Sequence, residues 1–112
     1  MTKTQFHVET VEDFGQRFID AWKRAEKGED FVERHHSFES WETMQSVLSA
    51  KRIEMLKYLR THQEKSIKSL AEHIQRDYRR VHEDVQILRG AGLISQEGLR
   101  VECDTISTEI AL

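Results

Sequence analysis

Proline is absent from the 112-residue chain, and cysteine occurs once, at Cys103. A single cysteine excludes a disulfide within the chain and is typical of a reducing compartment, so we expect a cytoplasmic protein. No apolar run approaches the roughly 20 residues of a membrane-spanning helix, and we expect no association with a membrane. Without proline, only glycines and capping residues interrupt helices, which favours a mainly helical chain.

The chain also lacks the common motifs of catalysis and metal binding. Its six histidines show no ligand spacing, and His35 and His36 would point to opposite faces of the strand predicted there. There is no Cys-x-x-Cys, no His-Glu-x-x-His and no glycine-rich phosphate loop. Cys103 has no histidine near it in sequence. We therefore expect no catalytic residue, no metal and no cofactor, and a protein that is not an enzyme.

Charge is unevenly distributed along the chain, although the net charge is only −3. Residues 1–50 hold 6 Lys/Arg and 10 Asp/Glu, residues 51–92 hold 10 and 6, and residues 93–112 hold 1 and 4. The middle segment is thus net positive between two acidic segments. This asymmetry points weakly to a nucleic-acid-binding segment.

Residues 1–40 are predicted to form a strand, a helix and a second strand. Residues 5–10 alternate between apolar and polar, Thr10 is placed to cap a helix that Gly28 ends, and residues 31–38 form the second strand. One side of the helix carries an apolar stripe at heptad-like spacing: Val11, Phe14, Phe18, Ala21 and Ala25.

Two interpretations of this stripe remain open, namely packing in the core and a surface for a dimer or a partner. Two tryptophans in so short a chain favour an interface, because tryptophan is enriched at interface anchors. The interface candidates are Phe14, Phe18, Ile19, Trp22 and Trp41.

Residues 41–105 are predicted to form helices followed by a hairpin. Helices are expected over 41–48, 50–60, 67–74 and 78–89, with Ser40, Ser49, Ser66 and Asp77 as caps and Gly90-Ala91-Gly92 as a stop. Residues 93–103 would form a short hairpin. The last three of these helices and the hairpin, in this order, predict a winged helix-turn-helix within an α+β, mainly helical chain. Residues 106–112 alternate again and form a C-terminal strand that could join the first strand.

The helix after Asp77 carries the chemistry of DNA recognition. Spacings of 3, 4 and 3 predict a core face of Tyr78, Val81, Val85 and Leu88. The opposite face then carries Arg79, Arg80, His82, Glu83 and Gln86. Arginine bonds guanine and glutamine bonds adenine in the major groove, and a recognition helix makes its base contacts from its first turns.

Residues around this helix are suited to positioning it on the sugar-phosphate backbone. Arg76 lies in the turn, and the helix start at Ser66 offers backbone N–H groups to a phosphate, with Lys68 and Ser69 beside it. Arg100 lies near the base of the hairpin, beside the minor groove. The predicted DNA contacts are Ser66, Lys68, Ser69, Arg76, Tyr78, Arg79, Arg80, His82, Glu83, Gln86 and Arg100.

The run Arg-Asp-Tyr-x-x-Val-His-x-Asp-Val at residues 76–85, with Ser66–Ala71 before it and Gly92-Leu93-Ile94 after it, resembles a family of prokaryotic winged-helix DNA-binding proteins. These are MarR-like regulators and often antitoxins. The resemblance covers roughly residues 38–103 and implies a transcriptional regulator that binds its own promoter as a homodimer and holds a toxin protein. In the family pattern Asp84 is expected to orient an arginine or to tie to the preceding helix.

Three domains follow from this: residues 1–40 for dimerisation or partner binding, residues 41–105 for binding double-stranded DNA, and residues 106–112 as a C-terminal strand. An alternative is a winged-helix module that binds only proteins, which the acidic flanks favour. The two differ in whether salt-sensitive DNA binding exists.

Overall fold

The computed structural model describes residues 3–9, 11–26 and 33–112. The chain divides into two compact units, which we call the sheet unit (residues 1–44 and 103–112) and the helical unit (residues 45–102). The predicted cap Thr10, the predicted stop Gly28 and residues 31–32 lie outside the described residues. None of the described helices is both long and apolar enough to span a membrane.

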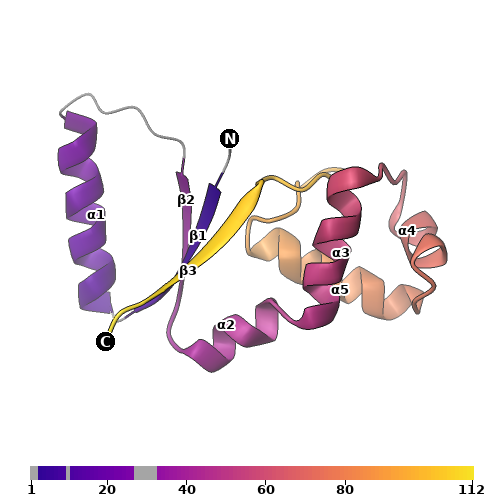
Figure 1. The fold of residues 1–112 in the computed structure, drawn as a ribbon, viewed down its shortest axis with the longest axis horizontal. Helices are drawn as coiled ribbons and strands as arrows, with labels where there is room; N and C mark the ends of the chain where they lie inside the picture. The colour runs from indigo at the N-terminus through magenta and orange to yellow at the C-terminus, as the bar shows by residue number, and fades with distance from the viewer. Residues whose placement is uncertain (1–2, 10, 27–32) are drawn as a thin grey trace. The chain divides into compact units, whose positions relative to one another are not determined.

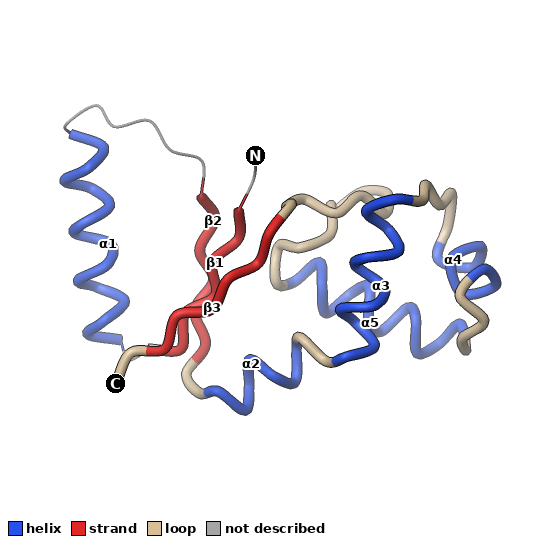
Figure 2. The backbone as a smooth tube through the Cα atoms, in the orientation of Figure 1, coloured by secondary structure: helices blue, strands red, loops and turns tan. Residues whose placement is uncertain are grey.

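The sheet unit is built on three parallel strands, β1 (Lys3–Val8), β2 (Glu33–Phe38) and β3 (Thr105–Ile110), in the order β2-β1-β3 (Figure 2). Lys3 of β1 pairs with Glu33 of β2 and with Thr105 of β3. Helix α1 (Val11–Glu26) connects β1 to β2 and lies beside the sheet (Figure 1). The predicted N-terminal strand, helix and second strand and the C-terminal strand are confirmed, with ends shifted by a few residues.

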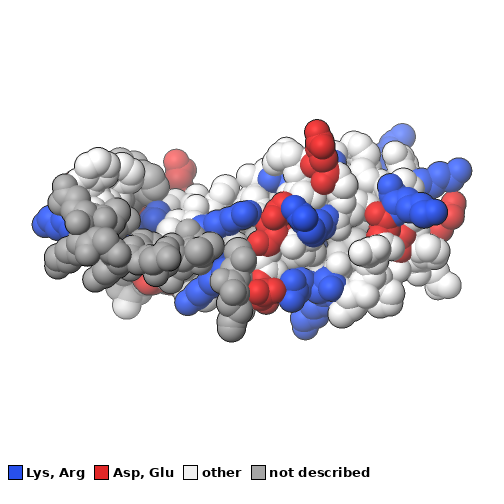
Figure 3. Space-filling model, turned by 90° about the horizontal axis from the view of Figure 1, so that it is seen from above, with Lys and Arg blue, Asp and Glu red and all other residues white. Residues whose placement is uncertain are grey.

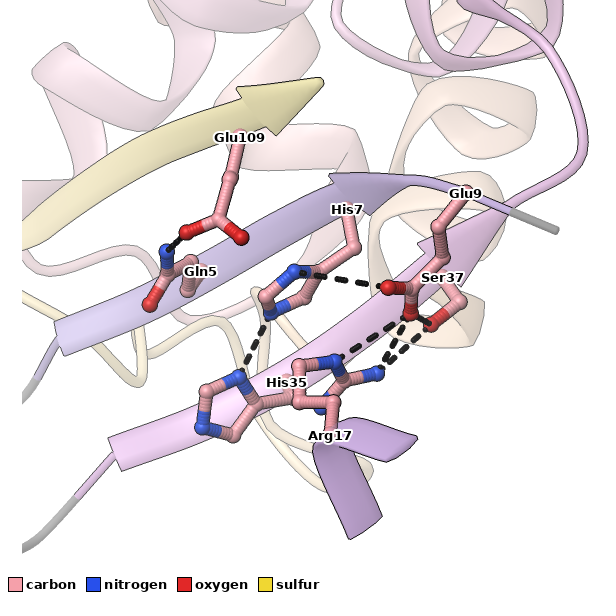
Figure 4. Close-up of polar contacts among 7 residues, drawn as sticks. All are labelled: Gln5, His7, Glu9, Arg17, His35, Ser37 and Glu109. Atoms are coloured by element: carbon pink, nitrogen blue, oxygen red, sulfur yellow. Dashed lines mark hydrogen bonds and ion pairs between the residues drawn. The ribbon is translucent and has the colours of Figure 1, made fainter. Parts of the chain in front are cut away.

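The two faces of β1 differ in polarity. Thr4, Phe6 and Val8 are buried on one face, where the Phe6 and Phe38 rings meet edge to face with centroids 5.1 Å apart. Gln5 and His7 occupy the other face, because side chains alternate along a strand. This second face receives Arg17 from α1 (Figure 4).

The helical unit contains α3 (Ala50–Thr61), α4 (Ile67–His73) and α5 (Tyr78–Gly90), while α2 (Trp41–Val47) crosses the boundary between the units. Each predicted cap forms: the side chains of Ser40, Ser49, Ser66 and Asp77 accept from the backbone N–H three residues on. These caps satisfy amides that the first helical turn leaves without a partner. The α+β class is confirmed for the described residues, about half of which are helical.

The core of the helical unit is apolar and drawn from all three helices and the segment after α5: Met55, Leu56, Leu59, Leu70, Val81, Val85, Leu88, Leu93 and Ile94. Tyr78 was predicted to belong to this core, and that prediction is wrong, since 52% of Tyr78 is exposed. Tyr78 is the first residue of α5, and helical side chains lean toward the helix N-terminus. Its ring therefore projects beyond the core and lies against His82, with centroids 6.0 Å apart.

The ends of α4 and α5 share one hydrogen-bond pattern. After α4, Gln75 N–H donates to Glu72 C=O and Arg76 N–H donates to Ala71 C=O. After α5, the amides of Gly92 and Leu93 make the equivalent bonds. Both are Schellman motifs, whose penultimate residue takes a left-handed conformation. Glycine fills that position after α5 (φ 75°), whereas glutamine fills it after α4 (φ 56°).

The segment predicted as a hairpin forms one antiparallel bridge, between Ile94 and Val101. Two backbone bonds of 2.9 Å flank the bridge, one from Ser95 N–H and one from Glu102 N–H. Arg89 of α5 donates to the carbonyl oxygens of Ser95 (2.9 Å) and Gly98 (2.6 Å). The tip is therefore fastened to the C-terminal end of α5, by a residue that the sequence did not single out.

Candidate nucleic-acid interface

The outward face of α5 carries the five residues predicted to contact bases. Arg79, Arg80, His82, Glu83 and Gln86 are all exposed. On the opposite side Val81, Val85 and Leu88 are fully buried, so packing fixes which side of the helix faces solvent. The predicted partition of α5 into a buried and an exposed face is thus confirmed, apart from Tyr78.

Arg79 and Arg80 lie in the first turn of α5 and point in different directions, because successive helical residues are about 100° apart. Arg79 shares the middle of the outward face with Glu83 and Gln86. Arg80 lies at its edge, on the side of Asp84 and Ile87. Within the described part of the chain, neither guanidinium has an ion pair or a side-chain hydrogen bond. Both are thus available to an external acceptor.

Asp84 ties α5 to two other elements. Its Oδ1 accepts from Nε of Arg52 on α3 at 3.0 Å, and its Oδ2 lies 2.8 Å from Nη2 of Arg76 in the turn. The side chain of Asp84 is only 10% exposed. Arg52 also donates to the Ser46 and Val47 carbonyl oxygens. The expectation that Asp84 orients an arginine agrees with these contacts, and the helix to which Asp84 ties α5 is α3 rather than the preceding helix α4.

Arg76 is engaged inside the protein by this ion pair, and its side chain is 21% exposed. It also lines a cleft of about 400 Å³ together with residues of α4 and the start of α5, namely Lys68, Ala71, Glu72 and Tyr78. The structure therefore brings together three predicted DNA contacts, Lys68, Arg76 and Tyr78. Lys68 and Tyr78 are exposed, while part of the charge of Arg76 is balanced by Asp84.

Two predicted phosphate contacts at the start of α4 already have intramolecular roles. Ser66 caps α4, with its Oγ accepting from Ser69 N–H at 3.0 Å. The Ser69 hydroxyl donates to Glu64, which also contacts the Tyr58 hydroxyl (2.7 Å) and His73 Nδ1 (2.6 Å). Hydrogen bonds from Ser69, His73 and Tyr58 lower the pKa of Glu64 to about 2. These bonds hold the loop before α4 in place.

Charged side chains of opposite sign are neighbours on the surface of the helical unit. Arg100, the predicted minor-groove contact, is 81% exposed and lies 3.8 Å from Glu102. Figure 3 shows Lys and Arg side chains standing next to Asp and Glu on the face that it draws. Specific contacts by a few arginines would therefore contribute more to any DNA affinity than a broad basic surface.

A polar cluster on the second face of the sheet was not predicted (Figure 4). Arg17 of α1 donates to Glu9 Oε1 (2.8 Å) and to the Ser37 hydroxyl (2.8 Å), and Ser37 donates to the same Glu9 oxygen (2.7 Å). His7 Nε2 and His35 Nδ1 are 2.7 Å apart. The parallel pairing of β1 with β2 brings the strand residues of this cluster together, and spacing along the sequence cannot predict such pairing.

The ionisable groups of this cluster are shifted by burial and by each other. Burial, with the nearby Arg17 charge, lowers the pKa of His7. Burial alone would raise the pKa of Glu9, but hydrogen bonds from Arg17 and Ser37 outweigh it and lower that pKa. A cavity of about 560 Å³ lies against the cluster. In the described residues, no set of three His, Cys, Asp or Glu side chains is arranged to hold a metal ion.

The residues predicted as an interface are exposed where their side chains are described. The exposed fractions are 63% for Phe18, 47% for Ile19, 62% for Trp22 and 41% for Trp41. The side chain of Phe14 lies outside the described part. Phe18, a member of the α1 stripe, is therefore not buried in a core formed by the described residues.

A family model described as HVO_A0114 matches residues 47–108, which include α3, α4, α5 and most of β3. No curated protein and no solved structure matches the chain.

Proposed function

This chain belongs to the HVO_A0114 family, and we propose that it is a sequence-specific DNA-binding transcriptional regulator. In this proposal the helical unit is a winged helix-turn-helix, with α4 and α5 as its two helices and residues 93–102 as a small wing. The protein acts as a homodimer on operator DNA and, as the antitoxin of a two-gene operon, binds a toxin protein. It functions in the cytoplasm.

The observation that carries the proposal is the exposure of Arg79 and Arg80 in the first turn of α5. The helix behind them is held by a buried apolar face and by the ion pairs of Asp84 with Arg52 and Arg76. A rigid helix that presents unbonded guanidinium groups at its N-terminal end is suited to major-groove contacts. Arg89, which fastens the segment after α5, supports a wing of fixed position.

Alanine substitution of the two arginines tests the proposal. In a gel-shift titration on the DNA upstream of the protein's own gene, Arg79→Ala and Arg80→Ala should each weaken binding by about 1–3 kcal/mol if they contact bases. Lys57→Ala, which removes an exposed charge from α3, is the matched control and should have a smaller effect. Arg76→Ala is a poor test, because it also removes an ion pair of Asp84.

Unchanged affinity in both arginine variants would reject base recognition by α5. The second candidate is a winged-helix module that binds only proteins, which the mixed charge around the helical unit favours. That candidate predicts no salt-dependent binding to any duplex, whereas a regulator loses affinity steeply as salt rises.

A further inference from the structure

Helix α1 is attached to the sheet through its polar side. Arg17 reaches Glu9 and Ser37 at the sheet, and Asp13, Gln16 and Asp20 share the cavity between them. These four residues recur at spacings of 3, 1 and 3 and therefore lie on one side of the helix. An amphipathic helix on a sheet normally turns its apolar side toward that sheet. Here the polar side occupies that place.

The apolar side of α1 consequently faces away from the sheet. Phe18 and Trp22 lie one turn apart, with Ile19 next to them, and are 63%, 62% and 47% exposed. An aromatic side chain carries roughly 150–250 Å² of surface, so each ring leaves on the order of 100–150 Å² in contact with solvent. A contiguous apolar area of this kind marks an interaction surface.

The charges along the edge of this apolar side are self-complementary. Glu12 and Lys23 are both exposed and eleven residues apart, which is about three helical turns, so they lie on the same edge. Ile19 lies between them. If a second α1 packs against the first in the opposite direction, like edges meet and Glu12 of each helix lies beside Lys23 of the other. In a parallel pair this edge would instead face the opposite edge of the partner helix, so Glu12 and Lys23 would not pair across the interface.

We propose that a second copy of this chain covers the apolar side of α1, with the two α1 helices antiparallel and related by a two-fold axis near Phe18. The interface is isologous: Phe18 meets its own equivalent at the axis, Trp22 packs to either side, and two Glu12–Lys23 pairs close the ends. This arrangement specifies the homodimer of the proposed function, and it does not depend on DNA binding.

Sedimentation equilibrium of the full chain at about 50 mM salt, where surface charges are weakly screened, tests the arrangement. The unmodified chain should be a dimer, and Phe18→Glu, which places two carboxylates at the axis, should be a monomer. Glu12→Lys and Lys23→Glu should each raise the dimer Kd roughly tenfold, because each turns two attractive pairs into repulsive ones. Glu54→Lys on α3 is the control and should leave the Kd unchanged.

The double variant E12K/K23E decides the geometry. The two residues are about 16 Å apart along one helix and cannot pair within it. Restoration of the Kd to within about threefold of the unmodified chain therefore requires antiparallel helices from two copies. A double variant as weak as the singles overturns the antiparallel pairing. A chain that stays monomeric at about 100 μM, or a Phe18→Glu variant that still dimerises, overturns the second copy as occupant.

The dimer and the proposed function fail in distinguishable ways. A monomeric Phe18→Glu that still binds a single half-site, through Arg79 and Arg80, supports both. Unchanged DNA affinity in both arginine variants, with the dimer intact, rejects the proposed base recognition and leaves the α1 interface standing. A monomer whose Trp22 becomes shielded only when a co-expressed neighbouring protein binds would identify that protein as the occupant, and overturns the self-pairing.

Discussion

At the scale of single residues, the arrangement of the helical unit depends most on Asp84. A carboxylate in the middle of a helix has no local reason to be buried, yet Asp84 is only 7% exposed. Its two oxygens are used by Arg52 and Arg76, which come from α3 and from the turn before α5. One acidic residue thus fixes the position of α5 relative to the elements on either side.

Asp84→Asn should lower the free energy of unfolding by about 2–3 kcal/mol, because it leaves two partly buried guanidinium groups without a counter-charge. Urea unfolding measures the change. Glu83→Gln, an equally small change at the adjacent exposed carboxylate, should stay within about 0.5 kcal/mol. Equal effects of the two substitutions would contradict the role given to Asp84.

His7 should make the sheet unit sensitive to acid. Its pKa in the folded protein is lowered below the usual 6.5, so below that pH the unfolded chain binds more protons than the folded one. The contribution of His7 to the free energy of unfolding should therefore be complete above about pH 6.5 and should decline as the pH falls toward the lowered pKa. His36, whose pKa burial also lowers, adds to the decline.

Urea unfolding at pH 7.5 and pH 5.5 checks this dependence. His7→Gln should reduce the difference between the two pH values, whereas substitution of the exposed His62 by glutamine should preserve it. If the free energy of unfolding of His7→Gln differs between the two pH values as much as that of the unmodified chain, the acid sensitivity belongs to other groups.

At the scale of elements, features that depend on nearby residues were predicted from the sequence, whereas contacts between distant segments were not. The caps Ser49, Ser66 and Asp77 were predictable because a cap acts within three residues of itself. The spacing of apolar residues correctly predicted the buried face of α5. It placed Tyr78 in the core wrongly, because this spacing does not indicate at which residue a helix begins. The partners of Asp84 and the contact of His7 with His35 depend on pairing between distant segments, which spacing along the chain cannot report.

The turn between α4 and α5 contains a correctable strain. Gln75 adopts φ 56°, a conformation that costs an L-residue about 1–2 kcal/mol and glycine almost nothing. After subtraction of the larger entropy that glycine has in the unfolded chain, Gln75→Gly should stabilise the protein by about 0.5–1 kcal/mol. Gln86→Gly, in the middle of α5, should destabilise it by about 1 kcal/mol. Thermal unfolding of both variants measures the contrast.

At the scale of the whole molecule, the small net charge makes dimerisation important for the proposed binding of DNA. In the proposed regulator, few guanidinium groups among the described residues are available to DNA, so useful affinity would require two helical units on one operator. Phe18→Glu should therefore lower affinity for a two-half-site duplex to that for one half-site, while leaving half-site binding itself unchanged. Fluorescence anisotropy with both duplexes measures this, and equal losses on the two duplexes would mean that Phe18 acts through folding.

The pairing of Thr105 with Lys3 has a consequence for synthesis. The sheet takes its third strand from a segment made about a hundred residues after the first, and such distant pairings close slowly. The residues of the helical unit are all synthesised before β3, so we expect its helices to form first. Until β3 arrives, one edge of β1 has no strand to bond and is open to pairing with another nascent chain. We therefore expect each newly made molecule to gain its helices first and the protected edge of β1 last.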